Sequence, residues 1–219
     1  MLFDLRSKGR RRTVQVVYLG LALLIGGGLV LFGVGTGSGN GGLLNAFGGG
    51  SSNQSQQFSS AEKAAIKQTK QDPSNPAAWA ALETARYQNA SSAGFNTTTG
   101  TYTTAGKKEL SNATDAWQKY LTLTKTPQNN LAIFAGNAYS ALGDYANAAS
   151  AWEYATQSDP SSVKSFECLA MTAYAANQTR KGDLAAAKAA SLVPKATAKQ
   201  LTSQINLAKT QPSAAQEAC

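Results

Sequence analysis

Histidine is absent from this chain of 219 residues, and cysteine occurs only twice. Histidine is the usual general base near neutral pH and the commonest metal ligand, so its absence removes the residue on which many catalytic and metal centres depend. The acidic residues form no cluster at the spacing of metal ligands or of an acid and base pair. Glu153 could meet Asp144 or Asp159 in the folded chain, but we interpret these carboxylates as surface and capping residues. We predict no catalytic residue, no metal and no cofactor.

A phosphate-binding loop is also missing. The glycine-rich stretch at residues 35–50 has no predicted strand before it and no Lys-Ser or Lys-Thr pair after it. We therefore expect no nucleotide and no other small-molecule substrate.

Charge is missing from Val14 to Val34, a run of 21 uncharged and mostly apolar residues. At about 1.5 Å per residue, a helix of this length spans about 32 Å, enough to cross the hydrocarbon core of a bilayer. We predict one transmembrane helix over residues 13–35. A cleaved secretory signal is the alternative, but its apolar region is shorter and ends at a small-residue cleavage site.

The two flanks of this run differ in charge, and the difference predicts its orientation. Five basic residues precede the run, whereas the next basic residue is Lys63. Since Lys and Arg are retained on the cytoplasmic side, residues 1–12 should lie in the cytoplasm and everything after about Gly35 on the far side. We expect a single-pass protein of the inner or plasma membrane that contacts the lipid bilayer through one helix. The five basic residues are Arg6, Lys8, Arg10, Arg11 and Arg12.

Residues 36–58 are dominated by Gly, Ser, Asn and Gln. This composition buries too little apolar surface to fold, so we predict a flexible linker. A small apolar cluster of Leu43, Leu44 and Phe47 interrupts it. We favour contact of this cluster with the membrane surface, or no role at all; the alternative is a short docking motif for another membrane protein.

The formal net charge of +8 divides into two unrelated halves. Residues 1–12 carry five basic and one acidic side chain, which gives +4, and the remainder carries 15 basic and 11 acidic side chains, again +4. Beyond the apolar run the basic residues are scattered without a dense stripe, so we expect no nucleic-acid partner.

Alanine is abundant from Ala61 onward, and apolar residues recur at helical spacing with breaks at Asp-Pro, Thr-Pro and Gly-Asp pairs. This pattern predicts an all-α domain over residues 59–210, followed by a tail at residues 211–219.

Three stretches of this domain are related to one another. In the second, residues 129–162, Gly143-Asp144 predicts a tight turn, because glycine adopts a positive φ easily and aspartate caps the next helix. Asp159-Pro160 ends the second helix of this unit, and Pro194 follows Pro160 by 34 residues. Small residues alternate with large ones at the predicted helix contacts: Gly136, Tyr139, Ala148 and Trp152.

This spacing and these residues resemble the tetratricopeptide repeat (TPR) family, in which each unit of 34 residues is a pair of antiparallel helices. The resemblance implies an α-solenoid of about three TPR hairpins with flanking helices. The third unit, residues 163–196, has Asn177-Gln178 at its turn. The first has an opening helix at 76–88, an insertion near 89–109 that should be a surface loop or a small β-hairpin, and a second helix from Leu110. The flanking helices are expected at 61–71 and 196–210.

The TPR resemblance also implies a binding groove. TPR arrays present a concave surface, built from the first helix of each unit, that receives an extended or helical peptide. The alternative is that some of these side chains pack against neighbouring helices. The residues expected to line the groove are Thr84, Tyr87, Ile133, Asn137, Ser140, Lys164, Glu167, Met171 and Tyr174.

The two cysteines, Cys168 and Cys219, leave two alternatives. A disulfide would tie the tail to the third unit, in keeping with an oxidising compartment. Against it, Cys168 lies in an apolar helix, where buried free thiols are common, and Cys219 ends a polar tail. We favour two free thiols.

One N-terminal anchor followed by an extracytoplasmic TPR domain looks like the architecture of ancillary proteins of the bacterial Sec translocon. The resemblance implies a scaffold or holding factor that binds a protein or peptide partner at the membrane surface. The alternatives are an assembly factor of the cell envelope or of a secretion complex, an accessory subunit of a cell-wall enzyme, and a structural spacer.

Overall fold

The computed structural model describes residues 51–219, with side chains from Phe58 onward. The predicted transmembrane helix, its basic flank and the apolar cluster of Leu43, Leu44 and Phe47 lie outside the described residues. None of the described helices has the length and apolar character needed to cross a bilayer.

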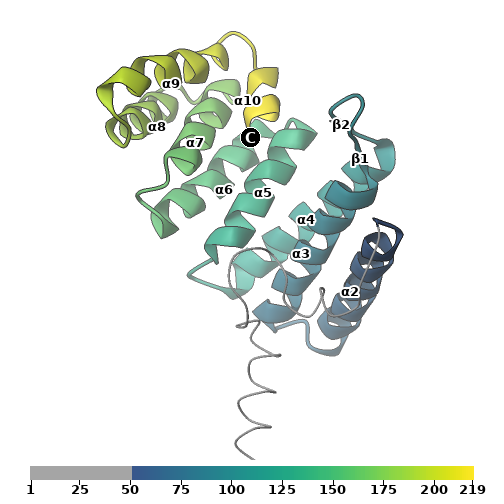
Figure 1. Cartoon of the computed structure of the whole chain (residues 1–219). Helices are drawn as coiled ribbons and strands as arrows, with labels where there is room; N and C mark the ends of the chain where they lie inside the picture. Colours follow the sequence, from purple (N-terminus) through teal and green to yellow (C-terminus); the bar gives the residue numbers. More distant parts are fainter. Residues whose placement is uncertain (1–50) are drawn as a thin grey trace, which may run out of the picture. The chain divides into compact units, whose positions relative to one another are not determined.

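The described part of the chain is an all-α domain whose successive helices pack in antiparallel pairs (Figure 1). Each pair also packs on the next, since α4 contacts α5 and α6 contacts α7. The all-α, repeat-like architecture predicted from the sequence is confirmed. The pairs are α3 (Pro76–Ala93) with α4 (Thr104–Leu123), α5 (Asn129–Leu142) with α6 (Tyr145–Ser158), and α7 (Val163–Ala175) with α8 (Thr179–Ser191).

A flanking helix lies at each end of these pairs. α2 (Ser51–Gln71) packs its buried Ala65 on Leu82 and Ala116 of the first pair. It begins at Ser51, so the last eight residues of the expected linker are helical. At the other end, α9 (Lys195–Leu207) packs on α7 and α8. The tail also contains a short helix, α10 (Ser213–Ala218).

The turn of the second unit has the predicted geometry. Gly143 has a φ of 77°, in the left-handed region that favours glycine, and the Asp144 side chain accepts a hydrogen bond from the Asn147 backbone N–H at 3.3 Å. At the equivalent turn of the third unit, Asn177 takes a φ of 60°. Asparagine tolerates this region better than most residues, which explains how the turn forms without glycine.

The insertion of the first unit forms a small β-hairpin, one of the two expected alternatives. β1 (Phe95–Asn96) pairs antiparallel with β2 (Thr101–Tyr102). The Asn96 side chain accepts the backbone N–H groups of Thr98 and Thr99 and so stabilises the turn. Because α3 extends to Ala93 and α4 begins at Thr104, the insertion is shorter than predicted.

The core is rich in alanines, which allow close helix contacts, and in aromatic rings, which fill the space between helices; a few larger aliphatic residues such as Leu131 and Ile205 complete it. Gly136 of α5 lies directly under the Trp152 ring of α6, where an added Cβ would stand 2.6 Å from the ring atom Cε2. The Trp152 ring occupies the space that a side chain at position 136 would need, which explains why glycine stands there. Packing of this density leaves little room for substitution.

Candidate functional site

All nine residues predicted to line a groove lie on α3, α5 and α7, the first helices of the three pairs. The structure brings two of them together from different helices, since Asn137 Nδ2 donates a hydrogen bond to the Tyr87 hydroxyl at 3.1 Å. The Tyr87 ring stacks on Phe134 with the ring centres 4.6 Å apart. Burial raises the pKa of Tyr87, so its hydroxyl stays protonated at neutral pH. Thr84 and Ile133 are half-buried beside this pair of helices.

Ser140, Met171 and Glu167 are buried, at 0%, 1% and 8% exposure. Ser140 donates its hydroxyl to a backbone carbonyl of its own helix, and the Glu167 carboxylate forms an ion pair with Lys164 at 3.3 Å. Lys164 itself keeps 58% of its side chain exposed. The burial of Ser140, Glu167 and Met171 agrees with the alternative that some residues of the predicted groove pack inside the domain.

Tyr174 is buried for a different reason. Its hydroxyl donates to Asp183 Oδ1 at 2.7 Å, and the Lys209 ammonium lies 4.2 Å from the centre of its ring. Helix α9 packs on α7, and Lys209 is the second residue after the end of α9. The ring also packs on Gly182 of α8, so Tyr174 is buried against its own helix pair and has almost no open surface.

The short helix α10 lies on α5 and α7, the same helices that carry most of the predicted groove residues (Figure 1). Ala215 is fully buried, and Ala214 and Ala218 pack against the core. Lys164 Nζ donates a hydrogen bond to the Ala218 carbonyl oxygen at 2.6 Å. The expected tail thus covers part of the face that the sequence assigns to a partner.

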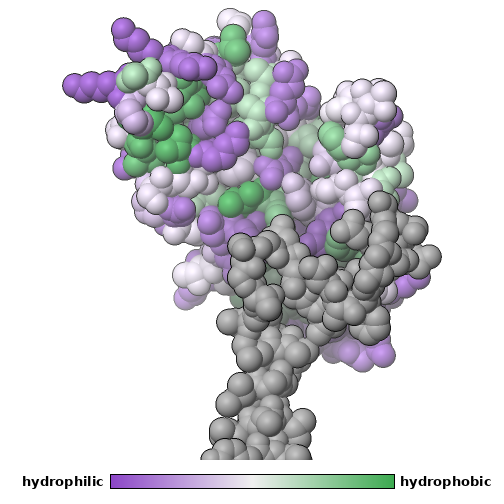
Figure 2. All heavy atoms as spheres, in the orientation of Figure 1, coloured by the Kyte–Doolittle hydropathy of each residue, from purple (hydrophilic) through white to green (hydrophobic). Residues whose placement is uncertain are grey.

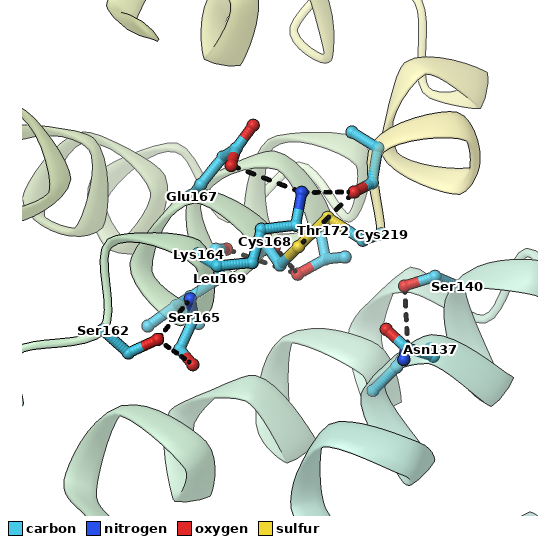
Figure 3. The surroundings of a disulfide bond; sticks show 12 residues. Asn137, Ser140, Ser162, Lys164, Ser165, Glu167, Cys168, Leu169, Thr172 and Cys219 are labelled. Atoms are coloured by element: carbon cyan, nitrogen blue, oxygen red, sulfur yellow. Dashed lines mark hydrogen bonds and ion pairs between the residues drawn. A yellow bond between two sulfur atoms is a disulfide. The ribbon is translucent and has the colours of Figure 1, made fainter. Parts of the chain in front are cut away.

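A disulfide joins Cys168 of α7 to Cys219, which follows α10 (Figure 3). The preference for two free thiols was therefore wrong. The two Cα atoms lie 5.6 Å apart, near the most common separation for a disulfide. Periodicity places Cys168 in an apolar helix correctly, but the docking of α10 is what brings Cys219 to it.

A cavity of about 340 Å³ opens beside α10. Its wall joins the hairpin, where Phe95 packs edge-on against Tyr102 at 5.0 Å between ring centres, to the start of α4 at Lys107. Tyr87 and Asn137 line it from α3 and α5, and Gln216, Glu217 and Cys219 line it from the tail. Aromatic, amide and charged groups of this kind suit a peptide segment.

A second hollow, of about 830 Å³, lies over α6, α7 and α8. Phe166, Leu169 and Leu184 give it an apolar lining, and Leu184 is 66% exposed. A Lys181–Glu153 ion pair of 2.8 Å borders it. Figure 2 shows hydrophobic residues gathered in the region of α8.

Glu83 of α3 is the most perturbed titratable group in the described part of the chain. It is fully buried, and neither carboxylate oxygen has a hydrogen-bond partner within that part. Burial raises its pKa from 4.5 to about 9, so the carboxyl is neutral at pH 7. Residues 58–219 hold no group of three acidic or cysteine side chains placed to bind a metal.

No protein-family model matches this chain, and a search of curated proteins finds no significant match. Function must therefore be inferred from the groups that the fold brings together.

The tail and the hairpin both contribute to this surface, and neither contribution was predicted from the sequence. The spacing of Ala214, Ala215 and Ala218 on one helical face was a usable signal for α10. The aromatic residues Phe95 and Tyr102 lie two residues before and two residues after the Thr-rich turn at 97–100, and they signalled the hairpin only weakly. Neither pattern specifies which helices these segments contact.

Proposed function

We propose that this chain is a membrane-anchored TPR-type protein whose helical domain binds other proteins outside the cytoplasm, as a scaffold or holding factor. The sequential antiparallel pairs, the left-handed Gly143 turn and the 34-residue spacing of Pro160 and Pro194 support the TPR assignment.

The observation that carries this proposal is the seating of α10 on α5 and α7. A helix of six residues buries its alanine face there and has a carbonyl oxygen bound by Lys164. A surface that accepts one short helix in this way has the shape and the donor needed for another. The adjoining cavity adds aromatic and amide groups from the first two pairs.

The expected location rests on charge and on the disulfide. Five basic residues before the apolar run favour a cytoplasmic N-terminus, and the Cys168–Cys219 bond suits an oxidising compartment on the other side of the membrane. Anchoring would restrict the domain to partners at the membrane surface, and the glycine-rich segment would let it search a short distance from there.

Co-purification of crosslinked partners from intact membranes tests the binding role. Phe95 and Leu184 are both exposed apolar residues, at 38% and 66%, and they lie in different hollows. We expect Phe95→Ser to reduce partner recovery at least severalfold and Leu184→Ser to leave it unchanged. Equal recovery from both variants and the unaltered chain would contradict a role for the cavity beside α10, and loss from Leu184→Ser alone would assign binding to the second hollow.

The side of the membrane is tested separately. A Gly49→Cys chain should react with a membrane-impermeant thiol reagent in whole or outer-membrane-permeabilised cells. The two native cysteines are joined and provide no competing thiol. Labelling that requires lysis would place the domain in the cytoplasm.

A further inference from the structure

We propose that α10 is a removable occupant of the face formed by α5 and α7, and that reduction of the Cys168–Cys219 disulfide frees this face for a short alanine-faced helix of a protein partner. The inference rests on the proposed function, because it names the regulation and the partner of that same surface.

The contacts of α10 are those of a bound ligand helix. Its small side chains Ala214, Ala215 and Ala218 point to the core, and Ala215 is fully buried. Its last turn is held at the Ala218 carbonyl, which accepts from Lys164 Nζ at 2.6 Å and lies 3.9 Å from Cys168 Sγ. One apolar stripe and one bound carbonyl are therefore what the face recognises.

These noncovalent contacts alone hold α10 weakly. The helix has six residues, and isolated helices of that length are unstable in water. Alanine also buries less apolar surface than any larger hydrophobic residue. The disulfide keeps α10 in place by closing a loop between positions 51 residues apart, so the covalent bond is the control point.

The two sulfurs differ in access. Cys168 is 0% exposed, whereas Cys219 is partly exposed and lines the cavity. A dithiol reductant can attack Cys219 Sγ as a thiolate, which breaks the S–S bond and expels Cys168 as a thiolate that then takes up a proton. The second thiol of the reductant attacks the mixed disulfide and releases Cys219. The chain gains two thiols, and the reductant leaves as its own disulfide.

The occupant also defines the chemistry of the partner. A competing helix must present small residues at the spacing of Ala214, Ala215 and Ala218, since Ala215 is fully buried where α10 packs on α5 and α7. It must also end near Lys164, whose ammonium can bind a free carbonyl of its last turn. Larger side chains at the buried position would not fit.

Thiol alkylation of the full-length chain tests release. After reduction with a dithiol, we expect Cys168 to be alkylated within about tenfold of the rate of Cys219, because local opening exposes both. A Cys168 that stays at least about a hundredfold slower than Cys219 would show that α10 remains docked without the bond, and would overturn the proposal.

Peptide binding tests the vacated face. The probe is a fluorescent peptide with the sequence of residues 211–218. We expect at least about tenfold tighter binding to the full-length Ala215→Glu, Cys219→Ser chain, whose own α10 cannot seat, than to the oxidised unaltered chain. Adding Lys164→Ala should weaken binding, and a peptide carrying Ala215→Glu should not bind. Equal binding to both chains, or equal binding of both peptides, would overturn the proposal.

Circular dichroism of each variant separates loss of binding from loss of folding, and the reduced unaltered chain provides a second test without any substitution. Peptide binding that depends on the open face, together with absence of crosslinked partners in membranes, would support the inference while contradicting the proposed function. If Phe95→Ser loses the partners but the oxidised and reduced chains bind them equally, the proposed function would be supported and the inference about α10 contradicted.

Discussion

Asn137 on α5 and Tyr87 on α3 are hydrogen-bonded to each other at 3.1 Å across a separation of 50 positions in the sequence. The bond links the first helices of two successive pairs at the wall of the cavity beside α10. Two residues that the sequence assigns to one groove therefore lie in direct contact.

Tyr87→Phe should reduce the free energy of unfolding by about 1 kcal/mol, because it removes this hydrogen bond and leaves a half-buried amide short of one acceptor. The stacking of the ring on Phe134 is kept. Denaturant titration followed by tryptophan fluorescence measures the change. Tyr145→Phe is the matched control, since the described part of the chain offers the half-buried Tyr145 hydroxyl no hydrogen bond. Equal effects of the two variants would contradict the role of the Asn137 bond.

Glu83 makes stability depend on pH. The unfolded chain loses this proton near pH 4.5, whereas the folded chain keeps it up to about pH 9. The unfolded state therefore binds fewer protons between these values, and the free energy of unfolding falls by about 1.4 kcal/mol per pH unit from this group until the loss ends above pH 9.

Glu83→Gln removes this dependence. The difference in free energy of unfolding between the variant and the unaltered chain should therefore shift in favour of the variant by about 2 to 4 kcal/mol between pH 5 and pH 8. Chemical denaturation at the two pH values measures it. Glu217→Gln, at an exposed position, should change neither value. A Glu83→Gln chain with the pH profile of the unaltered protein would show that Glu83 ionises normally.

Gly136→Ala should destabilise the domain by about 1 to 2 kcal/mol. The better helix propensity of alanine favours the variant by up to about 1 kcal/mol, but the added Cβ would lie 2.6 Å from a ring atom of Trp152, which is itself buried. Adding Trp152→Phe should recover part of the loss, and the double-mutant cycle gives the coupling between the two sites. Additive effects would contradict the close contact.

The helical part of the fold was predictable because local chemistry determines it. Gly143 and Asp144 each favour one backbone geometry, and the second unit begins and ends as expected, with α5 at Asn129 and α6 ending at Ser158. Asn177 occupies the equivalent turn of the third unit, because asparagine, like glycine, tolerates the left-handed region. The predicted start of α2 was wrong because its first residues are rich in Ser and Gln, a composition that fits either a linker or a helix.

The groove was less predictable because burial depends on segments distant in sequence. Register alone places Met171 and Tyr174 on the first helix of the third unit, but both belong to the buried core, where Tyr174 packs on Gly182 of α8. The prediction of two free thiols was wrong for the same reason. Cys168 and Cys219 lie 51 residues apart, and nothing in the local pattern of either indicates the other.

The central claim, that the face around the cavity beside α10 receives a protein partner at the membrane, is tested most directly by site-specific photo-crosslinking in intact membranes. A photo-reactive residue replaces Lys107, exposed at the cavity, and in a second chain Ser150, exposed on α6. The account predicts discrete protein adducts from position 107 that are absent from position 150. No adducts from position 107, or the same adducts from both positions, would contradict it.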